Sequence, residues 1–151
     1  MMKMNVVYSA MMAVCLMALV SCEEHTDIYD NRLSVGNILL SDNTLISPYG
    51  YDKDCHQAVG VVFYTSRDTA LVVGLRELGE YEYTDSMATV SGVKNDAYSM
   101  CGAENTAAIM ASEDLYSPAV EAVMMYDSPV SGWALPSAGE LRALSASLPD
   151  S

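Results

Sequence analysis

Two nearly adjacent apolar runs constrain the fold of this chain most strongly. Ala58–Tyr64 and Ala70–Leu75 are rich in valine, and only Thr65–Thr69 separates them. Their length and β-branching favour strands, and their lack of polar alternation favours burial on both faces. We therefore expect them to pair as the central antiparallel strands of a sheet.

A second hairpin is expected before these strands. Val35–Leu40 is a short β-prone run, and Asp42-Asn43 separates it from Thr44–Ile46. Asn and Asp tolerate positive φ, so this pair predicts a tight turn. A Val-Gly pair recurs at 35–36, 59–60 and 73–74, at irregular spacing that indicates hairpins rather than a repeat protein.

The second half of the chain predicts helices. Thr106–Ala111 is short and apolar, and Ser117-Pro118 is typical of a helix start, with Ser as the cap and Pro in the first turn. Arg76–Tyr98 before them has a mixed pattern that predicts an edge strand or a long loop. The fold class is therefore α+β: an antiparallel sheet with short helices packed on it.

The most distinctive internal stretch is Gly132–Leu141. Ser137 and Glu140 form a capping box, and the helix that they start would bury Leu141, Leu144 and Leu148 on one stripe. Pro136 predicts an extended entry to that helix. Trp133 is the only tryptophan, and it suits either a core anchor or a surface on which a ligand stacks.

The N-terminus has the pattern of an export signal. Lys3 is followed by the apolar run Val6–Val20 and then by Ser21-Cys22, which predicts a signal peptide over residues 1–21. The ending resembles the bacterial lipobox, in which the Cys22 sulfur is acylated. The alternative is a transmembrane helix, which needs about 20 apolar residues without interruptions such as Tyr8 and Ser9. Residues 22–32 then form an acidic tether and residues 33–151 a single domain.

Charge restricts the partners. The chain carries a formal net charge of −13, and removal of the signal takes away one lysine and no acid, which leaves −14. Nucleic acid and anionic lipid headgroups would both be repelled. Contact with a membrane is therefore expected through the acyl chains on Cys22 alone.

The cysteines fit an exported protein. Cys15 leaves with the signal and Cys22 carries lipid, so Cys55 and Cys101 remain as a pair in an oxidising compartment. We expect a disulfide between them, and the alternative is two buried thiols.

Catalytic and metal chemistry have little support. His56 with Asp54 lacks a nucleophile elbow, and Asp42, Asp52 and Asp54 lack the spacing of a calcium loop. We predict no enzyme activity, no cofactor and no metal. Four tyrosines could instead form an exposed aromatic platform for a glycan or protein ligand, or pack in part against the sheet: Tyr49, Tyr51, Tyr81 and Tyr83.

The order VGNILLSDNT, AVGVVFY, ALVVGL, ENTAAIM, YSPAVEAVMMY and GWALPSAGEL resembles a group of uncharacterised Bacteroides-type surface lipoproteins. Their domain carries a Trp-x-Leu-Pro-(Ser/Thr)-x-x-Glu-Leu motif, matched here by Trp133, Pro136, Ser137 and Glu140. The resemblance implies a C-type-lectin-like fold. In that family further strands follow this helix, and the calcium and sugar loops of true C-type lectins lie in the corresponding part of their fold. The domain is therefore expected to be incomplete at Ser151, and no ligand residue is carried over.

Together these features predict a lipid-anchored outer-membrane protein. Glu23 and Glu24 directly after Cys22 resemble the signal that places such lipoproteins on the cell surface, and the alternative is the periplasmic face. At the surface we expect a binding or adhesion module for glycan or protein. The alternative is an accessory structural lipoprotein of envelope assembly with no small-molecule ligand.

Overall fold

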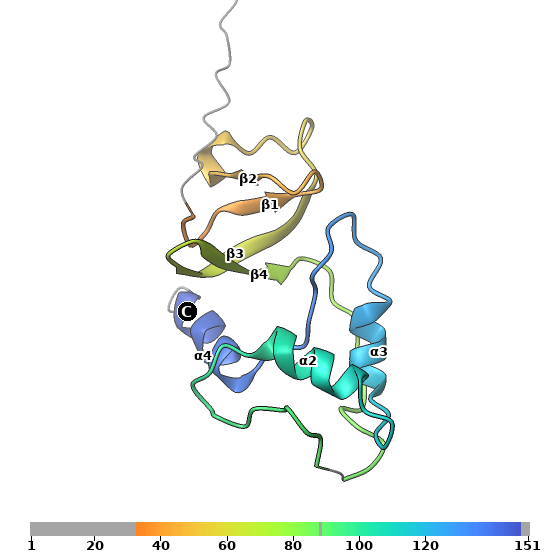
Figure 1. Cartoon of the computed structure of the whole chain (residues 1–151). Helices are drawn as coiled ribbons and strands as arrows, with labels where there is room; N and C mark the ends of the chain where they lie inside the picture. The colour runs from red at the N-terminus through yellow and green to blue at the C-terminus, as the bar shows by residue number, and fades with distance from the viewer. Residues whose placement is uncertain (1–32, 88, 149–151) are drawn as a thin grey trace, which may run out of the picture.

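A computed structural model describes residues 33–87 and 89–148. The elements in chain order are strands β1 (Ile38–Leu40) and β2 (Leu45–Ile46), the 3-10 turn η2 (Pro48–Gly50), strands β3 (Ala58–Ser66) and β4 (Thr69–Gly74), and helices α2 (Gly102–Met110), α3 (Pro118–Met124) and α4 (Ala138–Ser147). Within these residues the predicted α+β class is confirmed, with four antiparallel strands in one sheet and three α-helices (Figure 1).

The β3–β4 hairpin is the longest pairing of the sheet. Gly60 lies opposite Gly74 and Val62 opposite Val72, as predicted for antiparallel partners. The order of strands is β2-β1-β3-β4, so β3 is central, whereas β4 lies at the end of the described sheet rather than in its centre. Val62 is almost fully buried, but none of the β4 residues is, which corrects the prediction that both strands are covered on both faces.

The predicted tight turn between β1 and β2 is confirmed. Asn43 adopts φ of 67°, in the left-handed region that Asn tolerates. The Asp42 carboxylate accepts hydrogen bonds from the Thr44 hydroxyl at 2.6 Å and the Thr44 N–H at 3.0 Å. These local bonds stabilise the turn.

The helix caps agree with the sequence. The Ser117 hydroxyl accepts from the N–H of Val120 at the start of α3, and Ser137 and Glu140 form both bonds of the capping box at the start of α4. α2 begins at Gly102, four residues before the predicted start. The predicted apolar stripe of α4 is wrong in part, because Leu141 is half exposed and Leu148 lies beyond the helix and is also exposed.

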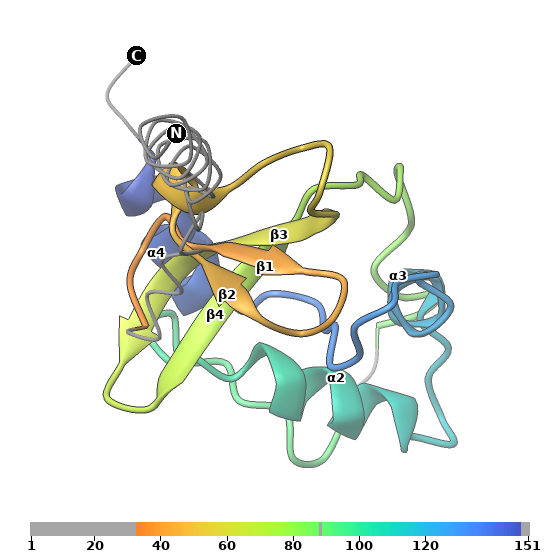
Figure 2. The same cartoon turned by 90° about the horizontal axis from the view of Figure 1, so that it is seen from above.

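One buried apolar cluster joins α2 to α3 and consists of Ile109, Val120 and, in the segment before α3, Leu115. Other buried apolar side chains lie on the first three strands: Leu39, Leu40, Ile46 and Val62. α4 packs against β3 and α2 against α3. Both views place α4 and α3 at opposite ends of the helical part, with the 126–137 segment running between them (Figures 1 and 2).

In the part of the chain described here, no helix has both the length and the apolar character needed to cross a membrane. The predicted signal peptide, the lipid site Cys22, Glu23, Glu24 and the tether of residues 22–32 lie outside the described residues.

Candidate functional site

Trp133 packs on the sheet where two facing residues on neighbouring strands are glycines and so have no side chain. Gly60 and Gly74 are register partners on β3 and β4, and a Cβ atom on Gly74 would lie 3.3 Å from the Trp133 ring. A Cβ on Gly60 would approach the carbonyl oxygen of Val73 at 2.8 Å. The recurring glycines therefore make a shallow seat in which the indole packs.

A stack of side chains holds this indole in place. Its Nε1–H donates to the carbonyl of Val130 at 2.7 Å, and the Tyr126 ring meets it edge to face with centroids 5.2 Å apart. The Arg76 guanidinium lies 4.5 Å from the Tyr126 centroid and donates to the carbonyl of Asp127. Edge-to-face rings and a cation over a ring are both attractive, so the stack ties the 126–133 segment to the chain leaving β4. Of the two predicted roles of Trp133, the anchor is the one that these contacts support.

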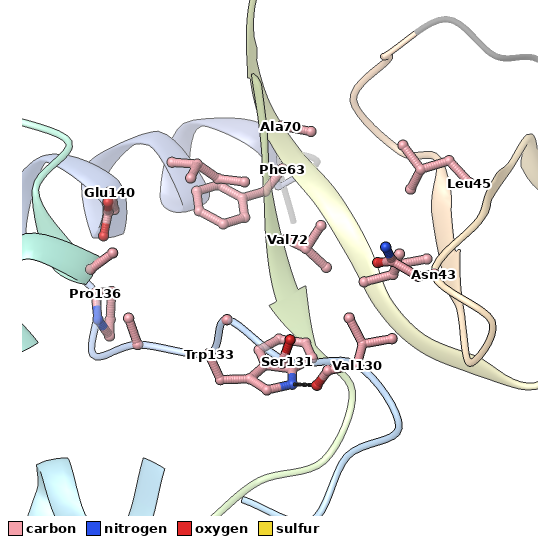
Figure 3. A pocket seen from close by; sticks show the side chains of 15 residues that line it. Asn43, Leu45, Phe63, Ala70, Val72, Val130, Ser131, Trp133, Pro136 and Glu140 are labelled. Atoms are coloured by element: carbon pink, nitrogen blue, oxygen red, sulfur yellow. Dashed lines mark hydrogen bonds between the residues drawn. The ribbon is translucent and has the colours of Figure 1, made fainter. Parts of the chain in front are cut away.

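An open groove of about 380 Å³ adjoins Trp133. Figure 3 shows Leu45 and Val72 directed into it from the sheet, with Trp133 and Val130 at one end and Pro136 and Glu140 at the far side. Asn43 and Ser131 bring an amide and a hydroxyl to its rim. An apolar concavity with a few polar groups is the usual form of a ligand site.

The rim next to Asn43 is negatively charged. The hydrogen bonds donated to Asp42 by the Thr44 hydroxyl and then by the Thr44 N–H hold the pKa of that carboxyl below its usual value. Stabilising the charged form keeps this exposed turn anionic at any physiological pH. A ligand with hydroxyl or ammonium groups would fit this rim better than an anion.

Glu140 reaches the groove but is occupied by structural bonds. Its Oε1 accepts from the N–H of Gly102 at 3.1 Å, and its Oε2 accepts from the N–H of Ser137 at 2.9 Å. One buried carboxylate thus satisfies the first amides of both α2 and α4. The charge also suits the positive ends of the two helix dipoles. The Glu of the motif is therefore a bridge between helices.

Ser137 completes the same junction. Its hydroxyl donates to the carbonyl of Ser99 at 2.7 Å and accepts from the N–H of Glu140 at 3.3 Å. Glycines permit the close approach: a Cβ on Gly139 would lie 2.5 Å from the Ser99 oxygen, and one on Gly102 would lie 2.5 Å from the Leu135 oxygen. Sequence reasoning missed these two glycines, although both lie within two residues of a cap.

The predicted tyrosine platform does not form as one surface. Tyr49 on η2 is fully exposed and Tyr51 is partly covered, whereas Tyr81 and Tyr83 are about half exposed on the loop after β4. Figures 1 and 2 show η2 and that loop at opposite sides of the molecule. Pairing of the 82–85 segment with the start of α3 causes the separation, since Ala119 N–H donates to the Glu82 carbonyl at 3.1 Å.

The sequence analysis did not predict an interaction of one tyrosine beside this segment. Tyr116 precedes α3, and its hydroxyl donates to the Glu121 carboxylate. That hydrogen bond raises the pKa of Tyr116, because the phenol must keep its proton to donate.

The predicted disulfide between Cys55 and Cys101 is absent from the structure. Cys101 is buried as the N-cap of α2, where the Asn105 side-chain N–H approaches its sulfur at 3.4 Å. Cys55 is exposed in the loop between η2 and β3, which lies at the far end of the sheet from α2 (Figure 1). Their pairing was inferred from the oxidising compartment and from the even number of remaining cysteines. Neither of these specifies the distance between the two sulfur atoms.

The residues considered for catalysis or metal binding do not form the sites that were considered. His56 Nδ1 accepts from the backbone N–H of Asp52 at 3.1 Å, and this bond orients the ring without Asp54. Within residues 33–87 and 89–148, no three His, Cys, Asp or Glu side chains gather in a way that could hold a metal ion.

Comparison of the chain with family models, with curated protein sequences and with solved structures gives no significant match.

Proposed function

We propose that this chain is a lipid-anchored envelope protein whose domain binds a glycan or protein ligand in the groove beside Trp133. The observation that carries the proposal is the groove itself: an open apolar concavity between a sheet face and an aromatic anchor, with an amide and a hydroxyl at its rim. Its volume of about 380 Å³ lies within the range of small-ligand sites.

The chemistry of the groove favours a neutral, hydroxyl-bearing ligand. Apolar patches of a sugar ring pack on aromatic and aliphatic side chains, while its hydroxyls need donors and acceptors such as Asn43 and Ser131. The anionic Asp42 and the net charge of −13 disfavour acidic ligands. A C-type-lectin-like arrangement, which the motif Trp133–Glu140 resembles, is part of the same proposal.

Replacing Asn43 with glycine tests the groove. Glycine keeps the positive φ of the turn but removes the rim amide, so we expect about tenfold or weaker ligand binding with an unchanged melting temperature. A glycan array followed by calorimetric titration of the strongest glycan measures binding, and a thermal scan of each variant measures the melting temperature. Tyr49→Ala is the matched control, because Tyr49 is fully exposed and is not a lining residue of the groove. Loss of binding in Tyr49→Ala but not in Asn43→Gly would contradict the groove as the site.

Replacing Cys22 with serine tests the anchor. We expect the protein to move from the membrane fraction to the soluble fraction, because serine cannot carry the thioether-linked lipid and several acyl chains are needed for stable attachment. Fractionation followed by immunoblotting measures this. Ser21→Ala keeps a small residue before the cysteine and should leave the protein in the membrane. A Cys22→Ser protein that stays in the membrane would contradict lipidation.

Orientation is a separate part of the proposal and rests on Glu23 and Glu24. Protease added to intact cells should digest the domain if it faces outward. Complete protection would place it on the periplasmic face.

The periplasmic result would favour the second candidate, an accessory structural lipoprotein. One observation supports that role: large apolar side chains are exposed around the helices, including Met87, Met110, Met124 and Met125. Exposed methionines suit a protein surface that adapts to a partner. Recovery of one defined envelope protein with the chain, and no bound glycan, would select this alternative.

A further inference from the structure

A second cavity, the helix-side cavity, lies next to Trp133 between β4 and helices α3 and α4. Its volume is about 320 Å³, and the 133–136 segment forms a further wall. Trp133 and Glu140 line both this cavity and the groove, whereas Asn43 and Ser131 line the groove but not this cavity. The two spaces therefore meet at the indole but offer different polar groups to a ligand.

The helix-side cavity is not part of a closed core. Of the residues that line it, only Glu140 is buried, and large apolar side chains such as Phe63, Leu135 and Leu144 remain partly accessible. Well-packed interiors leave few voids larger than a water molecule. An engineered apolar cavity of about 150 Å³ is already large enough to bind benzene. The helix-side cavity therefore has room for a longer apolar molecule.

The charged groups of this cavity favour an anion at its exposed end. Arg76 and Glu140 are the charged residues that line it, and both Glu140 oxygens already accept backbone amides. Arg76 is exposed, and its guanidinium lies over the Tyr126 ring and donates to the carbonyl of Asp127. It forms no ion pair with a carboxylate of the described residues. Because a guanidinium has five N–H donors, Arg76 keeps donors for a ligand.

We propose that the helix-side cavity binds a long-chain carboxylate, with the chain among the apolar walls and the carboxylate on Arg76. Burial of the chain against Val72, Leu144 and Trp133 removes apolar surface from water. Arginine and carboxylate form charge-assisted, often bidentate hydrogen bonds, which offset locally the negative charge of the chain. This site is independent of the ligand proposed for the groove.

Trp133 provides the signal for the test, because it is the only tryptophan of the chain and lines the cavity. A terminally brominated undecanoate is titrated into the whole chain in phosphatidylcholine vesicles, with uptake by empty vesicles subtracted. We expect saturable quenching of the Trp133 fluorescence. The same brominated chain with a trimethylammonium head should bind about tenfold or more weakly. A non-specific surface on a chain of net charge −13 would prefer the ammonium, so equal or stronger binding of the ammonium would overturn the proposal.

Arg76→Gln tests the assignment of the carboxylate. This variant should bind the brominated undecanoate about tenfold more weakly, because it loses the charged donors. It should bind the corresponding uncharged alcohol as the wild type does, which shows that the cavity is intact. Arg142→Gln is the matched control, since Arg142 is exposed and lies 4.8 Å from the Tyr98 centroid but does not line the cavity. An unchanged constant in Arg76→Gln, or an equal loss in Arg142→Gln, would overturn the proposal.

Asn43→Gly separates this proposal from the one for the groove. Asn43 lines the groove but not the helix-side cavity, so the undecanoate should bind this variant with the wild-type constant. A loss of undecanoate binding in Asn43→Gly would place the carboxylate ligand in the groove and overturn the second site.

Discussion

Replacing Glu140 with glutamine is expected to lower the free energy of unfolding by about 3 kcal/mol. Both carboxylate oxygens accept backbone amides, Oε1 from Gly102 and Oε2 from Ser137. Glutamine has one acceptor oxygen, so its NH2 group would face an N–H donor in a buried site. The loss combines a hydrogen bond to a charged group with the cost of an unsatisfied amide. Denaturant unfolding followed by circular dichroism measures the change.

Glu104→Gln is the matched control for this prediction. It makes the same change in the first turn of α2, but Glu104 is exposed and forms a surface ion pair with Lys94. Its stability should hardly differ from wild type. Equal losses in the two variants would show that helix N-terminal charge, rather than the bridge between α2 and α4, explains the Glu140 effect.

Replacing Gly139 with alanine is expected to destabilise the fold by about 3 kcal/mol. Its Cβ would lie 2.5 Å from the Ser99 carbonyl oxygen and 2.7 Å from the Tyr98 backbone. Backbone cannot move aside as a side-chain tip can, so the start of α4 would shift and strain the capping box. The midpoint of denaturant unfolding should fall accordingly.

Gly74→Ala provides the comparison. There the nearest atoms to an added Cβ are side-chain atoms of Trp133 and Tyr126, both at 3.3 Å. These rings can shift by a few tenths of an ångström, so we expect a loss below about 1 kcal/mol. If Gly74→Ala proved as harmful as Gly139→Ala, the distinction between backbone and side-chain crowding would be wrong.

The elements that the sequence predicted correctly depend on neighbours in the chain. The Asn43 turn needs only a residue that tolerates positive φ, and the caps at Ser117 and Ser137 need only an oxygen beside the free amides of the next turn. Hydrophobic runs with a short connection likewise favour the β3–β4 hairpin. Each of these interactions spans a few residues, so pattern alone contains the information.

The candidate site was only partly predictable, because its contacts join residues that are far apart in the chain. Glu140 was recognised as a cap of its own helix, but its second bond reaches Gly102, 38 residues away. Trp133 was expected to be either a core anchor or a ligand-stacking surface, and the pattern did not show that it packs on two glycines of separate strands. A sequence pattern gives no distance between such positions.

The same limit explains the corrections. Cys55 and Cys101 were paired because they were the two remaining cysteines, and four tyrosines were grouped because they are the same residue type. In the structure, the loop after β4 turns toward α3, whereas the loop after η2 lies at the other end of the sheet. The sequence by itself determined the strands, turns and caps, because short-range hydrogen bonds and side-chain preferences govern them. Only the tertiary structure decided the groove and the bridge between the two helices, because each depends on how segments distant in the chain pack together.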